Sequence, residues 1–555
     1  MKSNAMLVAA LCLCAVVAAC SGGGGGTSKN SVPGSNAGGS QRNAWTQPHV
    51  LRYATAADVN GLNPWFTQQI STLMMAQLTM AWLVKFDRHN MPYPELATEI
   101  PTQQNGGVSK DGLTITYHLR KGVKWSDGAP FSADDVAWSF KQMLNTSNNV
   151  TSRSGFDRIT KIDEPDKYTV VLHLSKPYSP FVETFFATGG ANPCILPKHL
   201  LAQYASLNNV PYNSLPVGIG PFKFKEWQRA TKVVMVANPL YWRGPPKLQQ
   251  IDFMIIPDRN TVLTSLQAHD LDLWFPVPGS YYARAKAIPG FSSLSQASFG
   301  FNHLDFNTQH AVVSDPAVRL ALEYALDRPT ILQKVYHGVG DVQEEVASPA
   351  APYFDPSIKT LPFDIAKANQ ILDRAGWTRG PDGIRQKGTQ KLVLNFATSV
   401  GSADADTMIE LIRQWWQQIG VRIDVHHYTA PVLFDSYQAG GIVYAGKFDA
   451  IIFEWFLDPI GDMSNLYACD QIPPAGQNDA RWCNQAATNA FHDLYARYDQ
   501  AGRSADDAIA MREMAKDVPV IVTSHPHDNY VYNSDLKNFE PNQTSQFDNM
   551  MNVDI

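Results

Sequence analysis

The sequence predicts an α/β protein with two lobes, each built around its own sheet. Two stretches alternate strand, helix and strand: residues 251–275 and, longer and more regular, residues 392–425. A chain of 555 residues also exceeds the size at which a single hydrophobic core stops growing. Two distant units of this kind therefore indicate separate lobes.

Each unit has recognisable boundaries. In the first, the strand Ile251–Ile256 is followed by a helix over Asn260–Ala268 and a return strand over Leu271–Phe275. In the second, apolar residues alternate from Leu392, then recur at helical spacing, and Gly420 ends the helix before the return strand. Both stretches thus have the pattern of a βαβ unit.

The composition excludes several classes of protein. The chain is 44% hydrophobic and 17% charged, with a net charge of −6, as in ordinary globular proteins. Its isoelectric point near 6.2 argues against a nucleic-acid partner, which usually requires a basic face. No apolar run long enough to cross a membrane follows residue 20, so we expect no membrane span in the mature chain.

The N-terminus has the pattern of an export signal. Lys2 precedes an apolar run over Met6–Ala19, and the box Val17–Cys20 resembles the site at which lipoprotein signals are cleaved and the cysteine is acylated. Residues 21–44, which are rich in Gly and Ser, predict a flexible tether. We therefore expect a signal over residues 1–20 and lipidation at Cys20; the alternative is a plain signal peptide that contains a chance cysteine.

The segment 113–144 predicts a strand, a turn and a capped helix. Leu113–Leu119 alternates between apolar and polar residues, and Trp125–Gly128 has turn composition. Ser132 with Asp135 forms a capping-box pattern at the start of a helix. One apolar face follows at helical spacing, made by Val136, Phe140, Met143 and Leu144.

Four further elements follow from periodicity. Strands are expected over Leu51–Ala54, Tyr168–Leu174 and Phe448–Phe453, and a helix over Pro316–Asp327. The last strand is mostly apolar, as is typical of a strand inside an α/β sheet.

Three cysteines remain after the signal and the lipid site are set aside. Cys469 and Cys483 close a short loop, and export to an oxidising compartment makes a disulfide between them the prediction. Cys194, beside proline and isoleucine, is expected to be a buried apolar residue. Because no Cys-x-x-Cys occurs, zinc and thioredoxin-like sites find no support.

Three dispersed motifs resemble one family. They are LRKGVKWSDGAPFSADDV at Leu119–Val136, GPF with NPLYW inside Gly218–Trp242, and FNHLDFN with VRLALEYALDR inside Phe301–Asp327. Together they resemble the extracytoplasmic solute-binding proteins of peptide and nickel ABC transporters, family 5, of the oligopeptide- and dipeptide-binding type. The resemblance implies a two-lobed, periplasmic-binding-protein-like fold of type II, in the large class with an extra domain, and a ligand cleft between the lobes.

The resemblance also implies domain boundaries. Lobe I would combine residues 45–85, 213–305 and 517–555, the extra domain would span 86–212, and lobe III would span 306–516. The ligand would lie between lobes I and III.

An enzyme or a metal site finds little support. The chain has no Gly-x-Ser-x-Gly, no His-Glu-x-x-His and no phosphate-binding Gly-rich loop. The carboxylates of Asp134 and Asp135 belong to a helix start, and His426 and His427 would point to opposite faces of a strand. His525-Pro526-His527 could share a face, and His199 is expected to be structural. We expect no catalytic residues, no cofactor and no metal.

The segment Phe448–Leu466 is the predicted ligand site. A strand in an α/β sheet delivers the residues after its end to the binding crevice, here Trp455, Asp458 and Asp462 in a loop. Trp455 matches a Trp of the family pattern, and Asp458 matches the Asp that binds the α-ammonium of a peptide in that family. Pro459, directly after Asp458, departs from the family pattern. In the alternative, Asp458 only shapes the loop and Trp455 is a core residue.

The opposite wall is expected after the Leu62-Asn63-Pro64 turn, at Gln68 and Ile70, with Trp274 and Asn307 as further candidates. In the family this region runs beside the peptide, where main-chain hydrogen bonds give affinity regardless of the side chains.

These observations predict a substrate-binding lipoprotein of an ABC importer for oligopeptides or dipeptides. It would be a monomer outside the cytoplasm, in the periplasm or on the outer face of the cytoplasmic membrane, held by its lipid and docking to permease subunits. The alternatives are another cargo on the same fold, such as a nickel chelate, haem, a sugar oligomer or an opine, or a secreted hydrolase.

Overall fold

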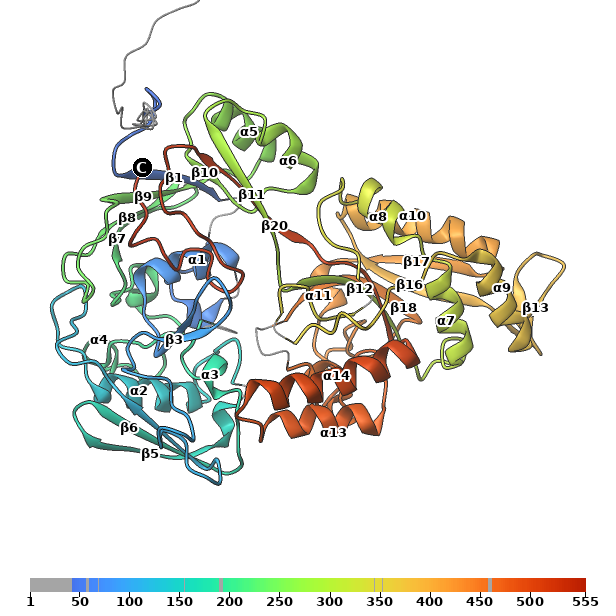
Figure 1. The fold of residues 1–555 in the computed structure, drawn as a ribbon, viewed down its shortest axis with the longest axis horizontal. Helices are drawn as coiled ribbons and strands as arrows, with labels where there is room; N and C mark the ends of the chain where they lie inside the picture. Colours follow the sequence, from blue (N-terminus) through green and yellow to red (C-terminus); the bar gives the residue numbers. More distant parts are fainter. Residues whose placement is uncertain are drawn as a thin grey trace, which may run out of the picture. The chain divides into compact units, whose positions relative to one another are not determined.

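Two large β-sheets and a smaller one organise residues 43–555, which group into one unit of the chain (Figure 1). The computed structural model describes residues 42–55, 59–67, 69–153, 155–188, 193–343, 345–351, 353–457 and 462–555. The predicted signal, Cys20 and most of the tether therefore lie outside the described residues.

The first sheet has seven strands in the order β11-β20-β10-β1-β9-β8-β7. Their bounds are β1 Val50–Thr55, β7 Phe222–Gln228, β8 Lys232–Ala237, β9 Gln250–Ile255, β10 Leu273–Trp274, β11 Phe291–Ala297 and β20 His527–Asn533. β1 pairs in parallel with both β9 and β10, so it lies between the two strands of the first predicted unit. Helix α5 (Arg259–Gln267) connects them as predicted, and α6 (Gly279–Ala285) follows β10.

The second sheet has five strands in the order β17-β16-β18-β12-β19. Their bounds are β12 Gly300–Phe306, β16 Val393–Ser399, β17 Arg422–Tyr428, β18 Ala450–Phe456 and β19 Val520–Ser524. The second predicted unit is present as β16, α10 (Ala403–Gln418) and β17, with β16 parallel to β17. Gly420 has φ of 80°, a left-handed conformation that suits glycine at a helix end.

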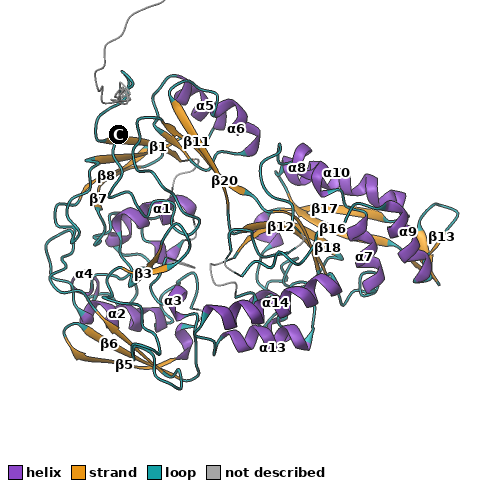
Figure 2. Ribbon diagram, in the orientation of Figure 1, coloured by secondary structure: helices purple, strands orange, loops and turns teal. Residues whose placement is uncertain are grey.

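Helices cover both faces of this second sheet (Figure 2). One apolar core joins the sheet to α10 and to α7 (Pro316–Tyr324), α8 (Arg328–Lys334) and α9 (Ile365–Arg374). Another core, on the opposite face, includes α12 (Ser464–Tyr467), α13 (Gln485–Leu494) and α14 (Gln500–Asp517). The short strands β13 Thr378–Arg379, β14 Arg385–Lys387 and β15 Gln390–Lys391 form a separate ribbon, and α11 (Ala430–Leu433) follows β17.

The strand pairing differs from the predicted lobe boundaries at two places. Residues 300–305 and 517–526 were expected in lobe I, yet β12 and β19 pair within the second sheet. Only residues 298–299 separate β11 from β12, and only 525–526 separate β19 from β20. Because the chain stays extended through both crossings, the residue pattern contains no break that would mark the change of sheet.

The third, three-stranded sheet lies in the predicted extra domain. It has the order β4-β6-β5, with β4 Thr114–His118, β5 Ile159–Asp166 and β6 Thr169–Leu174. The predicted turn is present, since the N–H of Gly128 donates to the carbonyl of Trp125 at 2.9 Å. Helix α2 (Ala133–Leu144) begins with the predicted capping box, in which the Ser132 N–H donates to Asp135 Oδ2 at 3.0 Å.

The core of this domain extends beyond the predicted 86–212. It includes Trp65, Trp82 and Ile219, because the chain on either side of the domain contributes to the same apolar cluster. The remaining elements here are β2 Val84–Phe86, β3 Pro92–Pro94, α3 Phe181–Thr184 and α4 Lys198–Leu201. Helix α1 (Ile70–Thr79) packs mainly into the apolar core of the first sheet. None of the described helices combines the length and the apolar character that spanning a bilayer would require.

Candidate functional site

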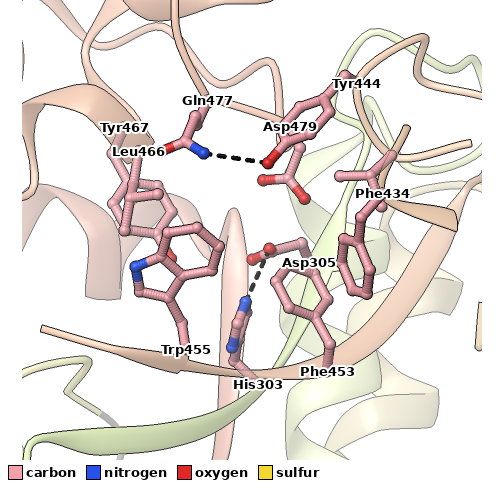
Figure 3. A pocket seen from close by; sticks show the side chains of 11 residues that line it. His303, Asp305, Phe434, Tyr444, Phe453, Trp455, Leu466, Tyr467, Gln477 and Asp479 are labelled. Atoms are coloured by element: carbon pink, nitrogen blue, oxygen red, sulfur yellow. Dashed lines mark hydrogen bonds and ion pairs between the residues drawn. The ribbon is translucent and has the colours of Figure 1, made fainter. Parts of the chain in front are cut away.

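A pocket lies on one face of the second sheet (Figure 3). Its floor comes from β12 and β18, and its walls come from the segments after α11 and around α12. It is lined by His303, Asp305, Phe434, Val443, Tyr444, Phe453, Trp455, Leu466, Tyr467, Gln477 and Asp479.

The register of β12 and β18 brings the floor residues together. The strands are antiparallel, and His303 lies opposite Phe453 while Phe301 lies opposite Trp455. Directly opposed residues share a face of a sheet, and so do residues two apart along a strand. His303, Asp305, Phe453 and Trp455 therefore all point to the same side.

The deepest part of the pocket is acidic. His303 Nε2 lies 3.0 Å from Asp305 Oδ2, and both side chains are only 2% exposed. Asp479 is also buried, and Figure 3 shows its carboxylate facing the pocket near that of Asp305. Burial raises the pKa of Asp479 well above its usual range, and the negative charge of Asp305 raises it further, while Arg481 acts in the opposite direction.

Aromatic rings form the upper part of the pocket. The Phe453 ring packs edge-on against His303, with centroids 4.3 Å apart, and against Phe434 at 5.5 Å. Trp455 packs edge-on against Phe453 at 6.3 Å. Phe434 is 38% exposed and Trp455 is half-buried, so the rim is accessible while the acidic floor is not.

Polar groups hold the remaining wall. Gln477 Nε2 donates to the Tyr444 hydroxyl at 3.0 Å, and Arg481 Nη2 donates to the Tyr444 carbonyl at 2.8 Å. Both contacts join the chain after α11 to the chain that carries Asp479. A pocket with a charged floor and an aromatic rim suits a ligand group that has an apolar stem and a charged end.

Trp455 lines the pocket, but from a strand rather than from the predicted loop. β18 continues to Phe456, because its pairing with β12 persists to the opposed pair Gly300 and Phe456. Asp462, predicted in the same loop, accepts a hydrogen bond from the Ser464 N–H at 3.1 Å, at the start of α12.

Ile70, Trp274 and Asn307, the predicted ligand residues that the structure describes besides Trp455 and Asp462, do not line this pocket. Asp458 and Gln68 lie outside the described residues. Ile70 is the first residue of α1 and is half exposed, whereas Trp274 is buried in an apolar core of the first lobe, edge-on to Tyr281. Asn307 is buried, and its Nδ2 donates to the Gly446 carbonyl at 3.0 Å, so its amide stabilises the loop that leads to β18.

His303, Asp305 and Asp479 were missed by the sequence analysis. Two of them could have been recognised from the sequence as candidate site residues, because His303 and Asp305 alternate with Leu304 and Phe306 in a strand. Two polar residues on one face of a central strand need partners or a ligand. Asp479 lies in an irregular segment and leaves no such pattern.

The predicted disulfide is present in the structure. Cys469 and Cys483 are bonded, with their Cα atoms 4.5 Å apart, and the loop that they close carries Gln477 and Asp479. Inside this loop, Asn478 Nδ2 donates to the carbonyls of Ala468 and Trp482, at 2.9 and 2.8 Å. Cys194 is a buried free thiol, as expected.

The histidines that were weighed as metal ligands have protein partners. His199 Nε2 lies 2.9 Å from Asp127, and His427 Nε2 lies 2.9 Å from Asp406. His525 is buried between two backbone carbonyls, and His527 Nε2 lies 2.9 Å from Asp341. Across the described part of the chain, no three His, Cys, Asp or Glu side chains group in a way that could hold a metal ion.

Comparison with known proteins finds one matching family model and several related sequences. Residues 91–473 match the model of the bacterial extracellular solute-binding proteins, family 5 (middle). The oligopeptide-binding protein AppA of Bacillus subtilis is 26% identical over 436 residues, which cover 77% of this chain and 78% of the relative. Protein XP55 of Streptomyces lividans is 32% identical over 431 residues, which cover 76% and 73%.

A solved structure gives the same result for the architecture. NikZ of Campylobacter jejuni, in complex with Ni(L-His), superimposes with a TM-score of 0.75 at 23% identity, over 92% of this chain and 100% of the other. This likeness shows that the two proteins share one two-lobed fold. The chain belongs to the bacterial extracellular solute-binding proteins of family 5.

Proposed function

We propose that this protein captures oligopeptides or dipeptides outside the cytoplasm and delivers them to the permease subunits of an ABC importer. It works as a monomer that is held at the membrane by a lipid on Cys20. The family membership supports the transport role, and the oligopeptide-binding relative from Bacillus subtilis supports peptide as the cargo.

The position of the pocket supports a binding role. In α/β sheets, ligands bind at the carboxyl ends of the strands. Trp455 lies at the carboxyl end of β18, which runs parallel to β16, and its ring forms part of the accessible rim. Aromatic side chains supply large contact area to a ligand at low entropic cost.

Cargo identification tests the proposal directly. Native mass spectrometry of the purified protein should detect co-purifying peptides, and a peptide library should raise its melting temperature. A ligand at 100 times its Kd stabilises a protein by about 2.7 kcal/mol. Recovery of a nickel chelate, haem, a sugar oligomer or an opine would replace peptide as the cargo, and cleavage of the added peptides would contradict a pure binding role.

The proposed anchor for the peptide's ammonium is Asp458. Its support is the match of Trp455 and Asp458 to the family pattern. Asp458→Asn should weaken binding of a free peptide at least thirtyfold, since removing one partner of a desolvated charge pair costs about 2–5 kcal/mol. N-acetylation of the peptide should then cost the variant almost nothing. If the variant still discriminates free from acetylated peptide as strongly as the native protein does, Asp458 only shapes its loop.

Lipidation of Cys20 is proposed from the box Val17–Cys20 and the Gly-rich residues behind it. In a host that processes lipoproteins, the native protein should partition into the detergent phase, whereas Cys20→Ala should stay aqueous or accumulate with its signal uncleaved. Phase partitioning and the mass of the mature N-terminus measure this. Identical partitioning of both proteins would contradict the anchor.

A further inference from the structure

The two carboxylates on the pocket floor are incompletely paired. Asp305 uses Oδ2 to contact His303, and its Oδ1 has no hydrogen-bond partner among the described residues. Asp479 Oδ2 has none either among those residues, although its side chain is buried. Buried carboxylate oxygens are nearly always hydrogen-bonded or paired, so two open ones at the same pocket require an explanation.

Charge at this position is costly when the pocket is empty. Two carboxylates that share a low-dielectric site cannot both stay ionised without a counter-charge, so one takes up a proton or a cation arrives. The nearby guanidinium of Arg481 only partly compensates: it donates to the Tyr444 carbonyl, and within the described chain it makes no ion pair with Asp479 inside 4 Å.

The walls above the acids suit the stem of a cationic group. Phe434 is exposed at the rim, Phe453, Trp455 and Leu466 are half-buried, and Tyr467 is buried. Alkyl stems of lysine and arginine pack against such surfaces, and aromatic faces attract the charged head. An anionic or wholly apolar group would leave the acids unpaired.

We infer that this pocket holds a cationic group of the cargo, an alkylammonium or guanidinium, with Asp305 and Asp479 as its counter-ions. The inference rests on the proposed peptide-binding function and adds a preference for cationic cargo to it. The group is a lysine or arginine side chain of the peptide, separate from the terminal ammonium that is assigned to Asp458.

Binding should release a proton. Because the pKa of Asp479 is raised, its carboxyl group stays protonated, before cargo binds, at a pH where an ordinary aspartate has lost its proton. An entering cation displaces that proton, so affinity for cationic cargo should increase with pH. The other ionisable groups that face Asp479 are Asp305, His303, Tyr444, Tyr467 and Arg481.

Calorimetry with matched peptides tests the inference. Alanine tetrapeptides that carry one lysine at each position in turn are compared with the same peptides carrying norleucine, which has a similar stem and no charge. The native protein should favour lysine at one position at least tenfold, about 1.4 kcal/mol. N-acetylation of these peptides should leave the lysine preference unchanged, because the terminal ammonium is assigned to Asp458. If lysine has no advantage over norleucine at any position, the inference is overturned.

Variants locate the preference in the pocket. Asp479→Asn and Asp305→Asn should each reduce the lysine preference to less than threefold while norleucine peptides still bind, which shows that the variants are folded. Asp470→Asn is the matched control, because it removes the same charge from an exposed site of the same lobe, where Asp470 contacts His492. A lysine preference that survives in both pocket variants would overturn the assignment.

Two measurements on the native protein need no variant. Titrations of the lysine peptide in buffers of different ionisation enthalpy should show proton release, and buffer independence would overturn the role of Asp479. n-Butylammonium should raise the melting temperature more than n-butanol at equal concentration. If it does so while every peptide fails to bind, the pocket inference stands and the peptide function falls; if it does not, the inference falls on its own.

Discussion

Lys85→Met is expected to reduce the free energy of unfolding by about 3–5 kcal/mol, because it would leave the buried carboxylate of Glu95 and the largely buried one of Asp548 without their cation. Lys85 Nζ lies 3.6 Å from Glu95 Oε1 and 3.1 Å from Asp548 Oδ1, and the Lys85 side chain is 4% exposed. Burial lowers the pKa of Lys85, but the two carboxylates outweigh this and raise it well above its ordinary value. The ammonium therefore remains charged, and its loss should be measurable by urea denaturation.

Arg88→Met provides the matched control. Arg88 contacts Glu540 at 3.5 Å and joins the same two regions of the chain, but both side chains are more than half exposed. An exposed pair of this kind contributes about 0–1 kcal/mol, so this variant should unfold close to the native midpoint. Equal destabilisation by the two substitutions would contradict burial as the cause.

Removal of the Cys469–Cys483 disulfide is expected to cost about 3 kcal/mol of stability, the chain-entropy value for a loop of roughly 15 residues. The bridge spans a sequence separation of 14 and closes the loop that carries Asp479 to the pocket. The double variant Cys469→Ser/Cys483→Ser should therefore unfold at a lower urea concentration and also bind cargo more weakly.

Chemical reduction gives an independent check of the same bond. Because Cys194 is already a free thiol, dithiothreitol opens no other bridge in the described part of the chain. The reduced native protein should match the double variant in its urea midpoint, and reoxidation should restore it. If reduction leaves the urea midpoint unchanged, the predicted contribution of the disulfide is wrong, and hydrogen bonds such as those of Asn478 hold the loop without it.

Elements defined by near neighbours could be predicted from the sequence. The capping box of Ser132 and Asp135, the end of α10 at Gly420, and the pairing of Cys469 with Cys483 each depend on residues a few positions apart. Local hydrogen bonds and side-chain periodicity act within such windows, so the residue pattern contains the information. The family motifs added the overall architecture.

The candidate site was only half visible in the sequence. Trp455 was identified, but its place in β18 depends on pairing with β12, a strand more than a hundred residues earlier in the chain. His303 and Asp305 alternate with apolar residues, which marks one face of the strand as polar. The neighbouring sequence does not show which distant segment covers that face. Asp479 has no pattern at all.

The sequence by itself determined the α/β class, the capped and periodic elements, the family and the short disulfide loop of this protein. Only the tertiary structure decided that β12 and β19 belong to the second sheet, that Asp305 and Asp479 share one pocket, and that Lys85 meets Asp548. The physical reason is the range of the interactions. Periodicity and capping act between neighbours in the chain, whereas strand partners and buried charge pairs depend on which distant segments pack together.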